Sequence, residues 1–208
     1  MTSKILRIAF VWLLFATAAA ADATPPLVFP KAVTVRAFLF EPHADGNSIS
    51  SDLRAVNSTA VPRAGIRLSA QQINQLRRAL VPRPQPPQYP VAACFSPRHG
   101  FIFEDAEGKV VGIVDACFEC RGVSYDAPGF QARVKPIYDR FPRTNTAADQ
   151  QLQIKLDAEV EQVRSEFGIP PSQEVVDWGA LGKLVSALGL PAEPKPADYQ
   201  RLGAKAAP

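Results

Sequence analysis

Four side chains capable of binding a metal or carrying out thiol chemistry lie close together in the middle of the chain. Cys94 and His99 are separated by four residues, and Cys117 and Cys120 form a Cys-x-x-Cys pair. Zinc takes thiolate and imidazole ligands in a tetrahedral arrangement, and a Cys-x-x-Cys turn is a common source of two of them. The pattern therefore predicts a structural zinc site made by these four side chains.

The three cysteines of the chain also have other uses in an oxidising compartment. One pair can form a disulfide while the third cysteine stays a free thiol. Alternatively, Cys117 and Cys120 form a redox pair with Cys94 as the resolving thiol. The odd number of thiols favours zinc, because three thiols and one imidazole complete a tetrahedron. If His99 is not a ligand, a catalytic metal with an open position is a further alternative.

A β-hairpin is expected to position these residues. The runs 101–104 and 109–115 are apolar, β-branched or aromatic, and the turn between them begins at Asp105 and ends at Gly108. Asp105 can bond its own backbone, and Gly108 tolerates the positive φ that such turns require. We therefore expect the thiols and the imidazole at the open end of one hairpin.

The register of this hairpin follows from the turn. If Asp105 pairs with Lys109, counting back along both strands places His99 opposite Asp115. The same count brings Cys94, which precedes the first strand, near Cys120.

Residues 1–23 are expected to be a secretory signal peptide. Lys4 and Arg7 precede an apolar core, and Ala21 to Ala23 form a small-residue cleavage site. The apolar run is shorter than the roughly 20 residues that cross a bilayer, so we expect no membrane span in the mature chain. The mature protein is therefore expected in the periplasm or outside the cell.

The composition limits the classes of partner. The whole chain has 23 basic and 20 acidic side chains, a net charge of +3. So small an excess does not predict nucleic acid or an acidic polymer as a partner. We expect instead an unidentified protein or other envelope partner.

An α+β fold of one domain over residues 24–191 is expected, in which about three helices pack on a small antiparallel sheet with the hairpin at its centre. A strand is expected over 32–41. Apolar spacing and capping residues predict the helices: from Ser69 to Pro82, from Thr146 to Phe167, and from about Asp177 to Gly189. The proline- and alanine-rich residues 192–208 are expected to be a disordered tail.

Three smaller expectations concern segments outside these elements. Residues 24–31 are expected to be a loose lead-in, and Arg77 and Arg78 a solvated flank of the first helix. His43 lies among turn-forming residues and is expected to have no role.

No sequence motif predicts a reaction. The chain lacks a Gly-x-Ser-x-Gly elbow, a phosphate-binding loop, a dinucleotide fingerprint and a His-Glu-x-x-His motif. We therefore assign no catalytic residue, and the sequence leaves open whether the protein is an enzyme.

The site residues and their neighbours resemble a family of uncharacterised secreted bacterial proteins. The resemblance covers about residues 32–191 and rests on the patterns Cys94-Phe95-x-Pro97-Arg98-His99, Asp105-x-x-Gly108-Lys109 and Cys117-Phe118-x-Cys120, with the capped helix at Leu68-Ser69, Gln72 and Leu76 and the Leu-Gly-Leu-Pro at 188–191. It implies that the three cysteines and the histidine act as a unit in a secreted protein, and it implies no activity or substrate.

Overall fold

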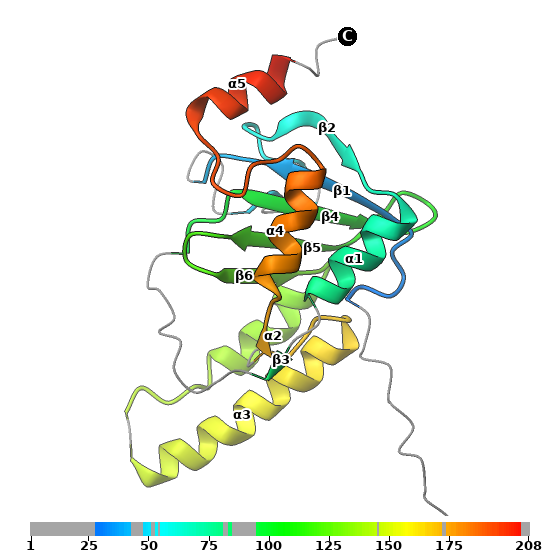
Figure 1. The fold of residues 1–208 in the computed structure, drawn as a ribbon. Coiled ribbons are helices and arrows are strands. Elements are labelled where there is room, and N and C mark those ends of the chain that lie inside the picture. The colour runs from blue at the N-terminus through cyan, green and yellow to red at the C-terminus, as the bar shows by residue number, and fades with distance from the viewer. Residues whose placement is uncertain are drawn as a thin grey trace, which may run out of the picture.

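Five antiparallel strands form the main sheet of the computed structural model (Figure 1). In chain order these strands are β1 (Thr34–Leu39), β2 (Val61–Arg67), β4 (His99–Glu104), β5 (Val110–Cys117) and β6 (Gly122–Asp126). They are arranged in the order β2-β1-β4-β5-β6, which places the expected hairpin, β4 and β5, inside the sheet. Two further strands of two residues each, β3 (Arg83–Pro84) and β7 (Glu174–Val175), pair with each other.

In the part of the chain that the structure describes, five helices accompany the sheet: α1 (Ala70–Leu80), α2 (Phe130–Tyr138), α3 (Ala147–Glu166), α4 (Trp178–Ala187) and α5 (Pro196–Ala204). The predicted α+β fold class is thus confirmed, although the helices outnumber the expected three. The structure describes residues 28–42, 48–50, 53, 55–80, 83–84, 95–144, 146–171 and 174–204. Within these residues, no helix is both long enough and apolar enough to cross a membrane.

Both faces of the sheet are covered, which explains why its central strands are apolar almost throughout. One face packs against the helices through side chains such as Val35, Phe101 and Val114, all buried in the larger core cluster. The other face holds a smaller cluster, in which Phe38 and Ile102 pack against residues of the segment 48–60. Alternation along each strand therefore decides which layer a side chain enters.

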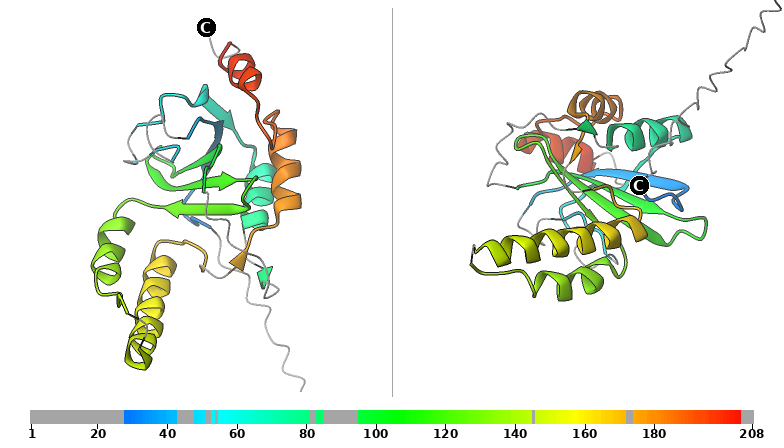
Figure 2. Two further views of the ribbon diagram at one scale, coloured as in Figure 1. Left: turned by 90° about the vertical axis from the view of Figure 1, so that its left-hand side faces the viewer. Right: turned by 90° about the horizontal axis from the view of Figure 1, so that it is seen from below.

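Helices α1 and α4 lie together on the first face of the sheet, as both views of Figure 2 show. The expected cap of α1 is present: the Gln72 amide N–H donates to Ser69, and the Ser69 amide N–H donates to the Gln72 side chain. Helix α4 begins at the predicted residue, because Asp177 accepts a hydrogen bond from the Ala180 amide.

Helices α2 and α3 form a helical hairpin that projects from the β6 side of the sheet (Figure 2). Thr146 and Asp149 make the reciprocal capping bonds that the sequence predicts at the start of α3. Helix α3 is anchored in the core from Leu156 onward, through Leu156, Val160 and Val163. Leu152 belongs to the apolar spacing of this helix, yet its side chain is 42% exposed because it lies on the projecting half.

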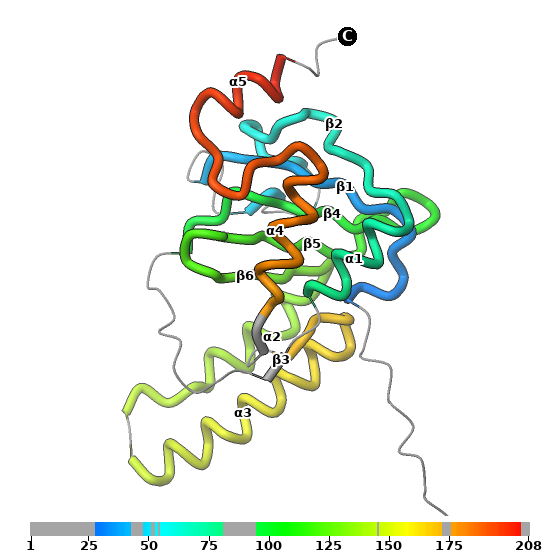
Figure 3. The backbone as a smooth tube through the Cα atoms, viewed as in Figure 1, coloured from blue at the N-terminus to red at the C-terminus, as the bar shows by residue number. Residues whose placement is uncertain are grey.

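The expectation of a disordered tail from residue 192 is wrong for the described residues up to 204. Beyond α4 the chain crosses the end of the sheet and forms α5 beside β2 (Figure 3). Leu202 is buried there, and the Tyr199 hydroxyl donates to the Phe40 carbonyl at 3.3 Å. The alanines and leucine of this segment supply helix propensity and one apolar anchor, which together outweigh its proline content.

The lead-in segment is also ordered from residue 28 onward. The guanidinium of Arg77 is buried and donates hydrogen bonds to the carbonyls of Val28, Phe29 and Ala32 at 3.2, 2.9 and 2.9 Å. The sequence-based placement of Arg77 on a solvated flank is therefore wrong, whereas Arg78 is exposed. Arg77 is buried because a guanidinium can satisfy several backbone carbonyls at once.

Candidate functional site

The hairpin of β4 and β5 has the expected turn but a register one residue away from the expected one. Asp105 pairs with Lys109 through an amide-to-carbonyl bond of 2.9 Å. A β-bulge then inserts Val111, because Glu104 pairs with Val110 while the preceding residue of β4 pairs with Gly112. As a result His99 lies opposite Ala116, and the prediction that it lies opposite Asp115 is wrong.

The Cys-x-x-Cys pair occupies the tight turn between β5 and β6. Cys117 ends β5, and its sulfur accepts a hydrogen bond from the Cys120 amide at 3.3 Å. Arg121 follows with a φ of 49°, a left-handed conformation that closes the turn before Gly122. Both cysteines are free thiols in this structure, Cys117 buried and Cys120 partly exposed.

The Cys120 sulfur is surrounded by backbone donors from two segments. The amides of Ser96 and Gly122 hydrogen bond to it and lower the pKa of the Cys120 thiol. Burial and the neighbouring Cys117 thiol act in the opposite direction and are stronger, so that the pKa of Cys120 is raised to about 11. The site thus offers hydrogen bonds to a thiolate, while burial keeps the thiol protonated unless a cation is near.

The segment that precedes β4 lies against this turn. A Cβ atom placed on Gly122 would meet the Phe95 ring at 3.0 Å and the Cys120 sulfur at 3.5 Å, so both groups lie directly beside Gly122. Cys94 itself lies outside the described residues, as does His43. The two residues after Cys94 are thus in contact with the Cys-x-x-Cys turn.

His99 is buried under the C-terminal segment. Its side chain is 1% exposed, and its Nε2 atom lies 2.9 Å from the Pro191 carbonyl oxygen. Burial lowers the pKa of His99 to about 4, with a smaller contribution from Arg98, so the ring is neutral at pH 7. A carbonyl only accepts hydrogen bonds, so Nε2 carries the proton and Nδ1 carries a lone pair. Nδ1 is buried, and among the described residues no group hydrogen bonds to it.

Alternation along the strands directs the side chains of His99 and Cys117 to opposite faces of the sheet, although both residues line the same end of it. His99 pairs with Leu39 and Ala116, both of which belong to the helix-covered face. Cys117 is the next residue after Ala116 in β5, so its side chain is directed to the opposite face. Within the part of the chain that the structure describes, no three His, Cys, Asp or Glu side chains are arranged to hold a metal.

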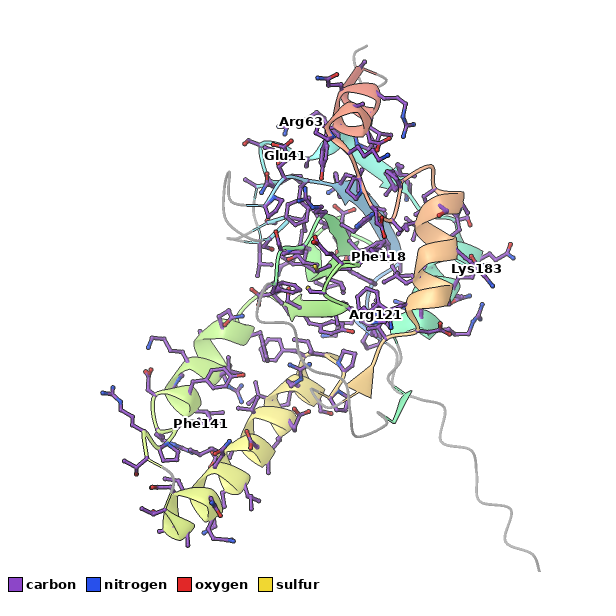
Figure 4. The ribbon with its side chains drawn as sticks, turned by 60° about the vertical axis from the view of Figure 1, so that its left-hand side comes forward. Glu41, Arg63, Phe118, Arg121, Phe141 and Lys183 are labelled. Atoms are coloured by element: carbon purple, nitrogen blue, oxygen red, sulfur yellow. The ribbon has the colours of Figure 1, made fainter. Side chains whose placement is uncertain are left out.

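A pocket of about 330 Å³ lies at this end of the hairpin, lined among others by Arg98, His99 and Cys117. Phe118 also lines this pocket. Its ring lies 4.7 Å from the His99 ring and 5.3 Å from that of Trp178 at the start of α4, and it is labelled in Figure 4 beside that helix. Phe118 therefore links the Cys-x-x-Cys turn to the helical layer.

Asp115 is a buried ionisable residue near the site whose environment sequence reasoning did not identify. It is 3% exposed on the face opposite His99, and its carboxylate accepts a hydrogen bond from the Ile49 amide at 3.0 Å. Burial raises the pKa of Asp115 to about 7, with a further contribution from Asp126, although the Ser48 hydroxyl and the Ile49 amide lower it. The available signal was an acidic residue inside an otherwise apolar strand.

Comparison with known proteins gives no relative, since no family model, no curated protein and no solved structure matches this chain.

Proposed function

We propose that this is a periplasmic or secreted binding protein whose hairpin is closed at its open end by a structural zinc ion. Cys94, Cys117 and Cys120 supply three thiolates, and His99 is the predicted fourth ligand. The observation that carries this proposal is the set of backbone amides directed at the sulfurs of the Cys-x-x-Cys turn. Such hydrogen bonds stabilise thiolates, and zinc supplies the positive charge that burial otherwise demands.

The tautomer of His99 supports its inclusion. Metal-binding histidines commonly donate the second ring N–H to a carbonyl, and the Pro191 carbonyl receives that bond here. This leaves Nδ1 as the atom available for a metal. The side chains of His99 and Cys117 are directed to opposite faces of the sheet, which argues against His99 as a zinc ligand. The histidine therefore needs its own test.

A redox role for Cys117 and Cys120 is the alternative, and their proximity favours it. The rate of thiol exchange depends on the thiolate, which usually forms at a helix N-terminus or beside a cation. The turn instead connects two strands, and the pKa of Cys120 is raised to about 11. The environment of the pair is thus better suited to holding a metal than to attacking a disulfide.

The zinc content of the purified mature protein tests the proposal. We expect about one zinc per chain, and a loss of most of it in Cys94→Ser, Cys117→Ser and Cys120→Ser. Glu119→Gln lies in the same turn, removes no thiol and is expected to keep the metal. A structural zinc contributes on the order of 10 kcal/mol, so a strong chelator is expected to lower the melting temperature sharply.

The other outcomes discriminate among the alternatives. Full zinc content in His99→Asn would remove the histidine from the ligand set and leave a site of three thiolates. A zinc-free protein with one fast-reacting thiol near neutral pH would replace the zinc proposal with the redox role. A zinc-free protein with a native disulfide would show that a covalent bond closes the open end of the hairpin instead. Such a disulfide contributes roughly 3 to 4 kcal/mol to stability.

A further inference from the structure

A second cleft, of about 400 Å³, lies at the turn end of the hairpin, away from the cysteines. Its walls come from the lead-in residues 29–31, from the hairpin turn and the start of β5, from residues 127 and 128 after β6, and from the end of α3 with the two residues that follow it. Its size falls in the range of small-molecule sites, roughly 300 to 1,000 Å³. Segments far apart in the sequence thus line one open cleft.

The cleft has apolar walls and basic groups at its edge. Its apolar walls include Phe29, Val110, Val111, Pro128 and Phe167, and Lys31 and Lys109 also line it. Both lysines are exposed, and neither forms an ion pair with any residue in the described ranges. A ligand with an apolar body and one negative charge complements this lining.

The two acidic groups of the cleft already have partners. The Asp105 carboxylate accepts the amides of Glu107 and Lys109 at 3.1 and 2.8 Å and so belongs to the turn. The Glu166 carboxylate pairs with Arg133 at 2.9 Å. Their charges are therefore partly satisfied, which leaves the lysine ammonium groups as the groups available to a ligand.

One wall of the cleft is held in an unusual conformation. Phe29 has a φ of 46°, which is strained for a bulky residue. The buried Arg77 guanidinium holds the carbonyl of Phe29 and those of Val28 and Ala32. Strained backbone persists only where the surrounding structure fixes it, and such positions cluster at binding sites.

The neighbouring wall, at the start of β5, is shaped to fit this conformation. Val111, which lines the cleft, is the extra residue of the β-bulge, and bulges often redirect side chains beside functional sites. The Phe29 ring fills the space where a side chain would stand on the neighbouring Gly112. At Gly168, where φ is +67°, a Cβ atom would come within 2.7 Å of the Pro30 ring. The wall is thus pre-formed rather than a chance gap between elements.

We propose that this cleft binds a small amphipathic carboxylic acid. Its acyl or aryl body lies against Phe29, Val111 and Phe167, and its carboxylate lies between the ammonium groups of Lys31 and Lys109. The inference is independent of the zinc site, because the two sites share no residue. It assigns the protein a small-molecule ligand in addition to any protein partner.

Titration calorimetry with decanoate, below the concentration at which it forms micelles, tests the proposal on the purified mature chain. We expect saturable binding of one decanoate per chain, with no saturable binding of decyltrimethylammonium. The double variant Lys31→Gln/Lys109→Gln is expected to bind decanoate about tenfold more weakly, since each exposed ion pair contributes up to about 1 kcal/mol. Ser165→Trp, which fills the cleft from the last turn of α3, is expected to abolish binding.

Lys155→Gln/Lys183→Gln is the matched control, because it removes the same charge from exposed lysines outside the cleft. This control is expected to bind decanoate as tightly as the wild-type protein does. Only variants whose melting temperature matches that of the wild type are compared. Equal weakening in both double variants would show a general charge effect and overturn the proposal. Absence of saturable binding, or equal binding of the cationic amphiphile, would overturn it as well.

Discussion

Two buried titratable residues with opposite pH responses lie on adjacent strands, His99 on one face of the sheet and Asp115 on the other. The pKa of His99 is lowered from 6.5 to about 4, so the unfolded chain binds the extra proton first and stability is lost as the pH falls from about 6.5 toward 4. The pKa of Asp115 is raised from 3.8 to about 7, so stability is lost as the pH rises through that range. The two contributions therefore offset each other in mild acid.

Replacing the Asp115 carboxyl should leave the pH dependence of stability that comes from His99 without its opposing contribution. Relative to the wild type, Asp115→Asn is expected to gain stability as the pH rises from 4 to 7.5, by up to roughly 4 kcal/mol. The asparagine side-chain oxygen still accepts the Ile49 amide, so the fold is retained. Urea unfolding at several pH values measures the difference between the two curves. A difference in stability that does not change with pH would contradict the raised pKa of Asp115.

At the scale of elements, capping and turn residues are predictable because they act locally. Ser69 with Gln72 begins α1 as expected, and Asp105 begins the hairpin turn. The β-bulge was not predictable, because the residue that packs beside it lies far away in the sequence: the Phe29 ring occupies the side-chain space at Gly112. The same holds for the site, where the Cys-x-x-Cys turn was placed correctly but the face of His99 depends on register and on the Pro191 contact.

The contact between α1 and the lead-in segment gives the second prediction. Arg77→Met removes the donors to three backbone carbonyls that are left inside the protein. Unsatisfied buried groups of this kind cost about 1 to 3 kcal/mol each, so we expect a loss of roughly 3 kcal/mol in the free energy of unfolding. Denaturant unfolding measures it. The adjacent and exposed Arg78→Met serves as control and is expected to change stability by less than about 0.5 kcal/mol; equal effects would contradict the role of Arg77.

At the scale of the whole molecule, the sheet with α1 and α4 forms one body and the α2–α3 hairpin projects from it (Figure 2). Sequence periodicity predicts α3 but not how far it leaves the core, since an apolar spacing does not say what it packs against. Neither α2 nor β6 was expected. In α2, Gly129 and the internal Pro136 obscure the helical pattern. Pro136 is tolerated in a short, half-exposed helix where few backbone bonds depend on it.

This arrangement predicts that residues 147–155 of α3 contribute less to stability than the part from Leu156 onward. Leu156 is fully buried, so Leu156→Ala is expected to cost about 2 to 4 kcal/mol. Ile154 is 62% exposed, and Ile154→Ala is expected to change stability by less than about 0.5 kcal/mol, because it removes little buried surface and alanine favours the helix. Amide hydrogen exchange should show the same division, with residues 147–155 opening at lower free energy than the strands. Equal losses of stability in the two variants, or equal amide exchange in residues 147–155 and in the rest of α3, would contradict the prediction. Either result would show that the projecting part of α3 has a packing partner and unfolds together with the sheet.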